Sequence, residues 1–103
     1  MFGKGSNQNA LQPPPVAQTD SKAVEVLRVW AVPDSAQQVT LRTTWKDAGA
    51  WGLMLVDVAR HAAKAYEKDG QDPSVVLSRI REVFDAEWDR PTDEPHDITD
   101  QSD

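Results

Sequence analysis

The sequence has 103 residues, which is enough for one small domain with a single hydrophobic core. It contains no cysteine, and this excludes disulfide bonds, thiolate catalysis and cysteine-based zinc sites. The formal net charge of -6 is concentrated at one end, because residues 91–103 carry five acidic and no basic side chains. The remaining chain has no clustered basic stripe, so we expect no binding to nucleic acid.

The first 18 residues contain no apolar run of about 7 to 15 residues, the pattern typical of a secretion signal. No window elsewhere approaches the roughly 18 apolar residues of a membrane span. We therefore expect a cytoplasmic protein that does not enter a membrane.

Both ends of the chain are predicted to be disordered. Residues 1–22 are rich in glycine, proline, asparagine and glutamine, and such a composition buries too little apolar surface to offset the entropy of ordering. Residues 91–103 are acidic and interrupted by proline. The predicted domain spans residues 23–90.

Two strands open this domain. Ala23 to Val32 is dense in β-branched residues, and Gln37 to Trp45 alternates apolar and polar side chains. The sequence PDSA between them is typical of a type I turn, so an antiparallel hairpin is the simplest pairing. The first strand has apolar residues on both faces.

Two helices follow the hairpin. The first begins after Asp47, a good N-cap residue, and stops at Gly70; the second begins at the Asp72 cap with Pro73 in its first turn and ends before Pro91. This order predicts an α+β domain, β-β-α-α, with both helices packed on one face of the hairpin. Residues expected to be buried, the two tryptophans largely so, are Leu27, Val29, Leu41, Trp51, Leu55, Val58, Ile80, Phe84 and Trp88.

Three stretches of the predicted domain resemble a family. They are EVLRVW from Glu25, WKDAGAWGLMLVDVARHAAKAY from Trp45 and RIREVFDAEWDRPTD from Arg79. Together they are similar to a small bacterial domain family of unknown function, over roughly residues 23–93. The resemblance implies no activity, cofactor or catalytic residue, and we expect the proline-rich start and the acidic end to lie outside it.

The second face of the first strand is the candidate surface for a partner. If the helices cover only Leu27 and its neighbours on the opposite face, an apolar strip remains exposed, and a soluble monomer tends to avoid such a strip. Pairing two hairpins about a two-fold axis, as one sheet or as stacked strips, would cover it and the unpaired strand edges. A different partner chain, or the residues just before Ala23, would serve as well. The candidate face consists of Val24, Val26, Arg28, Trp30 and Val32.

The stretch WKDAGAWG, from Trp45 to Gly52, offers a weaker candidate site. Amide groups at a glycine-containing helix start could hold an anion, with cationic side chains nearby. The alternative, which we favour, is that Asp47 caps the helix while the two tryptophans fold onto each other or onto the core. The residues of this candidate anion site are Arg42, Lys46, Gly49 and Trp51.

Asp57 and His61 lie four residues apart on one face of the first long helix. This spacing suits a general base or two ligands of a metal, but no third ligand follows from the spacing, so an ordinary surface pair is favoured. We expect no cofactor, no metal and no catalytic residue. The favoured function is a non-catalytic protein-binding or adaptor module that forms a homodimer through its hairpin; the alternatives are an anion or small-ligand sensor near Asp47 and a small enzyme that uses Asp57 and His61.

Overall fold

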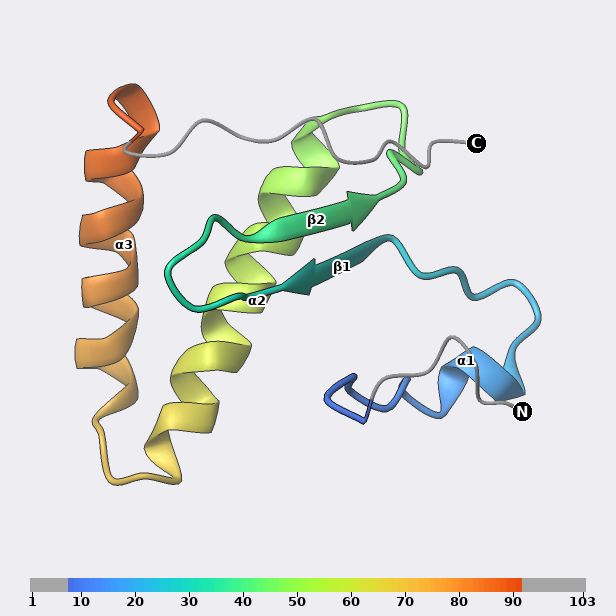
Figure 1. The fold of residues 1–103 in the computed structure, drawn as a ribbon, viewed down its shortest axis with the longest axis horizontal. Helices are drawn as coiled ribbons and strands as arrows, with labels where there is room; N and C mark the ends of the chain where they lie inside the picture. Colours follow the sequence, from blue (N-terminus) through green and yellow to red (C-terminus); the bar gives the residue numbers. More distant parts are fainter. Residues whose placement is uncertain (1–7, 92–103) are drawn as a thin grey trace.

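In the computed structural model of the protein, residues 8–91 are the part whose structure is described. It is an α+β domain in which a two-stranded antiparallel sheet precedes two long helices, so the predicted order β-β-α-α is confirmed (Figure 1). A single helical turn, which the sequence analysis did not predict, precedes the sheet. The elements are α1 (Val16–Thr19), β1 (Leu27–Trp30), β2 (Gln38–Leu41), α2 (Gly49–Glu67) and α3 (Pro73–Asp89).

The hairpin strands are shorter than predicted, at four residues each. Leu27 pairs with Leu41 and Trp30 with Gln38 at the two ends of the ladder. One further bond, from the Arg42 amide to the Val26 carbonyl at 3.0 Å, extends the pairing. Beyond it Thr44 has a φ of 63°, which turns the chain away from β1 and ends the ladder.

The turn between the strands differs from the predicted type I. The Ser35 amide donates to the Val32 carbonyl at 3.1 Å, which places Pro33 and Asp34 at its centre. Asp34 has a φ of 62°, whereas a type I turn requires a negative φ at that position. A type II turn fits this geometry, since aspartate tolerates the left-handed region better than most residues.

Helix α2 begins where the sequence predicts. The Asp47 carboxylate accepts a hydrogen bond from the Gly49 amide at 2.8 Å, so Asp47 does cap the helix start. Glycine suits this position, because a Cβ atom on residue 49 would lie 3.1 Å from Asp47 Oδ1. Gly70 has a φ of 90° and follows the end of the helix.

Helix α3 has the predicted cap. Asp72 Oδ1 accepts from both the hydroxyl and the amide of Ser74, each at 2.8 Å, and Pro73 occupies the first turn. The Ser74 hydroxyl, helped by the Ser74 and Val75 amides, lowers the pKa of the Asp72 carboxyl below its ordinary value. Neither α2 nor α3 is long and apolar enough to cross a membrane, and the same holds for the rest of residues 8–91.

The core is much smaller than predicted. In the described part of the chain only Ala63 and Val76, 3% and 8% exposed, are buried hydrophobic residues. They lie where α2 packs against α3. Of the residues expected to be buried, Leu27, Leu41, Trp51 and Ile80 are half-buried, whereas Val29, Leu55, Val58, Phe84 and Trp88 are exposed.

The cause is the way in which the elements pair. Strand contacts strand and helix contacts helix, but no Cα atom of β1 or β2 lies within 8 Å of a Cα atom of α2 or α3. Apolar periodicity identifies which face of a helix or strand is apolar. It does not say which other surface of the protein covers that face. Within residues 8–91 the hairpin and the helices leave much of those faces open.

Val76 should therefore be a sensitive position for stability. Val76→Ala removes buried apolar volume at the helix contact and should lower the free energy of unfolding by about 1.5 to 3 kcal/mol. Val75→Ala is the matched control, because Val75 is 63% exposed and its change should stay within about 0.5 kcal/mol. Urea unfolding at one fixed protein concentration measures both; equal losses would contradict the described packing.

Candidate functional site

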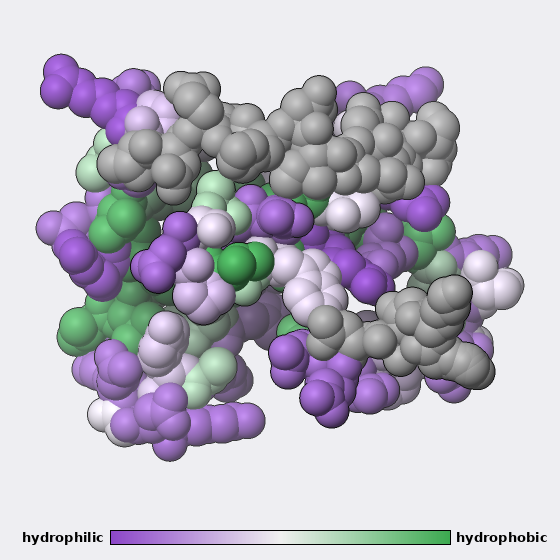
Figure 2. Space-filling model, viewed as in Figure 1, coloured by the Kyte–Doolittle hydropathy of each residue, from purple (hydrophilic) through white to green (hydrophobic). Residues whose placement is uncertain are grey.

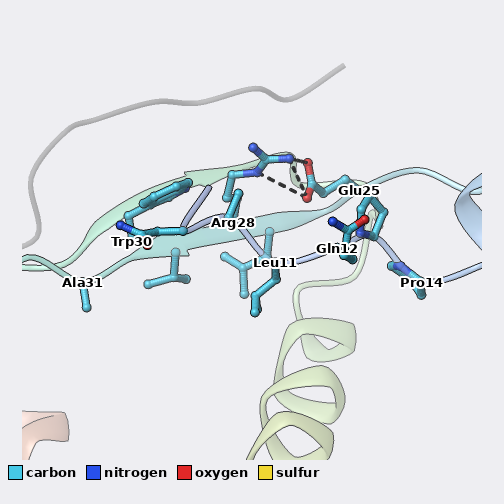
Figure 3. A pocket seen from close by; sticks show the side chains of 12 residues that line it. Leu11, Gln12, Pro14, Glu25, Arg28, Trp30 and Ala31 are labelled. Carbon is cyan, nitrogen blue, oxygen red and sulfur yellow. Dashed lines mark hydrogen bonds and ion pairs between the residues drawn. The ribbon is translucent and has the colours of Figure 1, made fainter. Parts of the chain in front are cut away.

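A groove of about 590 Å³ separates β1 from the segment that precedes α1, and we call it the β1 groove (Figure 3). Residues 9–14 form one wall, and Glu25 and residues 27–31 form the other. In Figure 1 the first of these segments lies beyond β1, on the side away from β2. The groove thus follows the outer edge of the sheet.

Arg28 and Trp30 stand on the same side of β1, and Ala31 lies on the opposite side (Figure 3). Arg28 Nη2 lies 3.0 Å from Glu25 Oε1, and both side chains are more than half exposed. An exposed ion pair contributes about 0 to 1 kcal/mol, so its main effect here is to hold the guanidinium along the strand. Trp30 is half-buried.

The backbone at the outer edge of β1 is available for pairing. In an antiparallel ladder, residue pairs that exchange hydrogen bonds alternate with pairs that do not. The bond between Arg42 and Val26 shows that this pair belongs to the first kind, and so do the pairs Arg28–Thr40 and Trp30–Gln38. The backbone groups of Arg28 and Trp30 therefore face β2, and those of Leu27 and Val29 face the groove. The hydrogen bonds within residues 8–91 provide no backbone partner for these groove-facing groups.

The residues of the candidate partner face are exposed only in part. Val24 and Val32 are exposed, while Val26 and Trp30 are half-buried. Val29, which belongs to the face expected to pack on the helices, is 50% exposed. Both faces of β1 therefore carry accessible apolar side chains, because the helices do not approach the strand closely.

The tryptophan corner, formed by Trp45 and Trp51, joins the hairpin to α2. The rings meet edge to face with centroids 5.8 Å apart, and Trp51 Nε1 donates to the Thr43 carbonyl at 3.0 Å. Thr44, which precedes Trp45, donates its hydroxyl to the Arg42 carbonyl at 3.0 Å. The prediction that the two rings fold onto each other is correct.

The candidate anion site at this corner already contains a carboxylate. The Asp47 carboxylate accepts a hydrogen bond from the Gly49 amide, and a bound anion would need that same amide. The negative charge of Asp47 also repels a second anion at this position. Lys46 lines an adjoining hollow of about 480 Å³ together with the tryptophans, whereas Arg42 lines a different one beside β1. The corner is thus built as a helix cap.

Asp57 and His61 do not form a side-chain pair. His61 Nδ1 lies 2.8 Å from the backbone carbonyl of Asp57, and both residues are exposed on α2. Residues 8–91 also contain no cluster of three or more histidine, aspartate and glutamate side chains that could hold a metal ion. The geometry favours an ordinary helix-surface arrangement.

A second apolar hollow, which we call the helix groove, lies between α2 and α3. It has a volume of about 190 Å³, and Figure 2 shows hydrophobic side chains at the surface on the side where α3 lies. Phe84 stacks on Trp88 with ring centroids 5.3 Å apart, and Trp88 is 70% exposed. Sequence reasoning recognised these apolar positions and assigned them to the core. The groove is lined by Val56, Ala59, Arg60, Leu77, Ile80, Arg81 and Phe84.

The family described as Domain of unknown function (DUF5076) matches residues 10–92. The match begins well before Ala23, so the expectation that the proline-rich start lies outside the family is wrong. None of the curated proteins matches the chain.

Four solved chains are similar to this one. One of them is described as "Structure of a putative pyruvate dehydrogenase" from the photosynthetic bacterium Rhodopseudomonas palustrus. It is 38% identical over 84% of this chain and 91% of its own length, with a TM-score of 0.68.

The tryptophan corner yields a direct test. Trp51→Phe keeps an aromatic ring but removes the hydrogen bond to the Thr43 carbonyl, which should lower the free energy of unfolding by about 1 kcal/mol. Trp45→Phe is the control, because the Trp45 indole shares the edge-to-face contact without that bond. Thermal or urea unfolding compares the two variants; a smaller loss for Trp51→Phe than for Trp45→Phe would contradict this account of the corner.

Proposed function

Because the chain belongs to the family described as Domain of unknown function (DUF5076), whose description assigns no activity, we propose a function from its surface. The domain is a non-catalytic protein-binding module that forms a homodimer through its hairpin. The helix pair then presents the helix groove to another protein.

The observation that carries the proposal is the amount of apolar surface left open. Only two apolar side chains of residues 8–91 are buried, and the others that contribute to packing are half-buried. Covering apolar surface contributes roughly 25 cal/mol per Å², so a second chain on the exposed side chains would add to the stability of the domain. The exposed apolar residues of the long helices are Leu53, Leu55, Val56, Val58, Tyr66, Val75, Val83, Phe84 and Trp88.

The hairpin is the favoured place for self-association, since β1 combines apolar side chains with groove-facing backbone groups. Two identical edges satisfy each other by the same hydrogen bonds, as a two-fold interface requires. The helix groove has a different character, because Arg60 and Arg81 lie beside its apolar side chains. Aromatic residues and arginine are enriched at protein interfaces, which supports its use for a partner protein.

An enzyme is the second candidate, because of the description of the 38% identical solved structure. In this chain Asp57 and His61, the candidate catalytic residues, do not form a side-chain pair. The His61 ring contacts the backbone carbonyl of Asp57 and not its carboxylate, and both residues are exposed. The binding module therefore remains the proposal. The proposal includes a cytoplasmic location. The absence of cysteine is compatible with a compartment in which disulfides are rare.

Sedimentation at micromolar concentration tests the proposal. The native chain should sediment at about twice its mass of 11.4 kDa. Val29→Asp places like charges on both paired edges and should give a monomer, whereas the control Val75→Asp, on α3, should remain a dimer. A monomeric native chain would refute the homodimer, and a dimeric Val29→Asp variant would refute the hairpin as its interface.

A further inference from the structure

We propose that residues 92–103 of this chain, the acidic segment, bind in the helix groove of the same chain. Ile98 lies on the apolar lining of the groove, and the aspartates on either side of it meet Arg60 and Arg81. The inference concerns a different surface from the hairpin and stands without the homodimer. Its consequence for the partner protein proposed above is autoinhibition, because such a partner reaches the groove by displacing the acidic segment.

The helix groove combines apolar side chains with positive charge. Arg60 and Arg81 are the charged residues of its lining. Arg60 makes no ion pair with another residue of 8–91. Arg81 Nε lies 2.9 Å from Asp85 Oδ2, with both side chains more than half exposed, and its two Nη groups have no hydrogen-bond partner within the same range. A ligand that fits this lining has an apolar anchor with carboxylates beside it.

The acidic segment has this chemistry. It contains five acidic side chains, no lysine or arginine, and Ile98 as its one large aliphatic side chain. Asp97 precedes Ile98 and Asp100 follows two residues later, so carboxylates stand on both sides of the apolar anchor. Single exposed ion pairs contribute little, and the apolar contact of Ile98 adds to them.

The length of the acidic segment fits the path to the groove. α3 ends at Asp89, at the end of the helix pair away from the connection between α2 and α3 (Figure 1). Arg90 leaves the helical conformation with a φ of -140°, as expected for a residue before proline. Arg81 lies about 12 Å back along the helix axis from Asp89, at 1.5 Å per residue. The chain from Pro91 to Ile98 spans up to about 23 Å when extended, which is enough for the turn and the return.

A second copy of the helix pair is the alternative occupant of the groove. Two-fold pairing of the grooves would bring Arg60 and Arg81 of both copies together, and like charges repel each other. The acidic segment brings the opposite charge to the same place. Charge complementarity therefore favours the acidic segment over a second groove.

The absence of native cysteine permits a disulfide test in the full chain. Ile98→Cys keeps a small apolar side chain at the anchor position and is combined with Val56→Cys, which lines the groove. In the control chain it is combined with Ala86→Cys, an exposed position two residues from Phe84 and hence on the other side of α3. Equilibration in a glutathione buffer measures the effective concentration of each thiol pair. Binding in the groove should raise the value for the Val56→Cys pair at least about tenfold above that for the Ala86→Cys pair, whereas a tether alone gives about millimolar values for both.

Two outcomes of this experiment would overturn the proposal. Equal effective concentrations for the two pairs would show that the acidic segment does not bind in the groove. A disulfide between two chains in place of one within a chain, seen as a doubled mass without reducing agent, would assign the groove to the acidic segment of a second copy. Neither outcome bears on the hairpin homodimer, which sedimentation of the native chain tests separately.

Arg81→Glu, added to the chain with Ile98→Cys and Val56→Cys, tests recognition of the acidic charge. Reversing the charge should lower the effective concentration of the thiol pair by about threefold or more. Arg79→Glu is the matched control, because Arg79 also lies on α3, also forms an exposed ion pair, with Glu82 at 2.8 Å, and does not line the groove. An equal decrease for both variants would contradict the contact between the aspartates and Arg81 and overturn the proposal.

Discussion

The contact between α2 and α3 at Ala63 and Val76 is the packing on which the described domain depends. It is the place where apolar side chains of residues 8–91 become buried. A small residue at position 63 lets the helices approach closely near the turn that joins them, and the Asp72 cap and Gly70 fix that turn. Further along the helices the apolar side chains are half-buried, as at Ile80, or exposed, as at Val58 and Phe84.

The hairpin is attached to this pair by a short and tightly bonded corner. Thr44 adopts a positive φ, which is costly for a β-branched residue, and the surrounding bonds of Trp51, Thr44 and Asp47 hold it there. The corner sets the direction in which β2 leaves α2. Among residues 8–91 the strands then stay away from the helix backbones, and the sheet keeps exposed apolar side chains such as Val29.

This arrangement explains why a search for chemistry within one chain finds so little. His61 meets only the backbone carbonyl of Asp57, and the Asp47 carboxylate caps α2, so these side chains do not converge on one site. Two of the hollows that combine apolar lining with arginine lie along β1 and between the helices. Both are open surfaces of the kind used by protein partners.

The sequence by itself determined the local structure of this protein. Asp47, Asp72, Pro73 and Gly70 act within a few residues of their own position, so the helix limits and the hairpin could be predicted from short-range chemistry. Even the edge-to-face contact of Trp45 and Trp51 followed from their proximity in the chain. The positive φ at Asp34 and Thr44 escaped prediction, because both residues also accept ordinary turn and strand conformations. Only the tertiary structure decided which apolar faces are covered. Periodicity marked Val29, Val58 and Phe84 as core positions, but burial depends on the distance to the opposing surface, and the structure keeps every Cα atom of β1 and β2 more than 8 Å from those of α2 and α3.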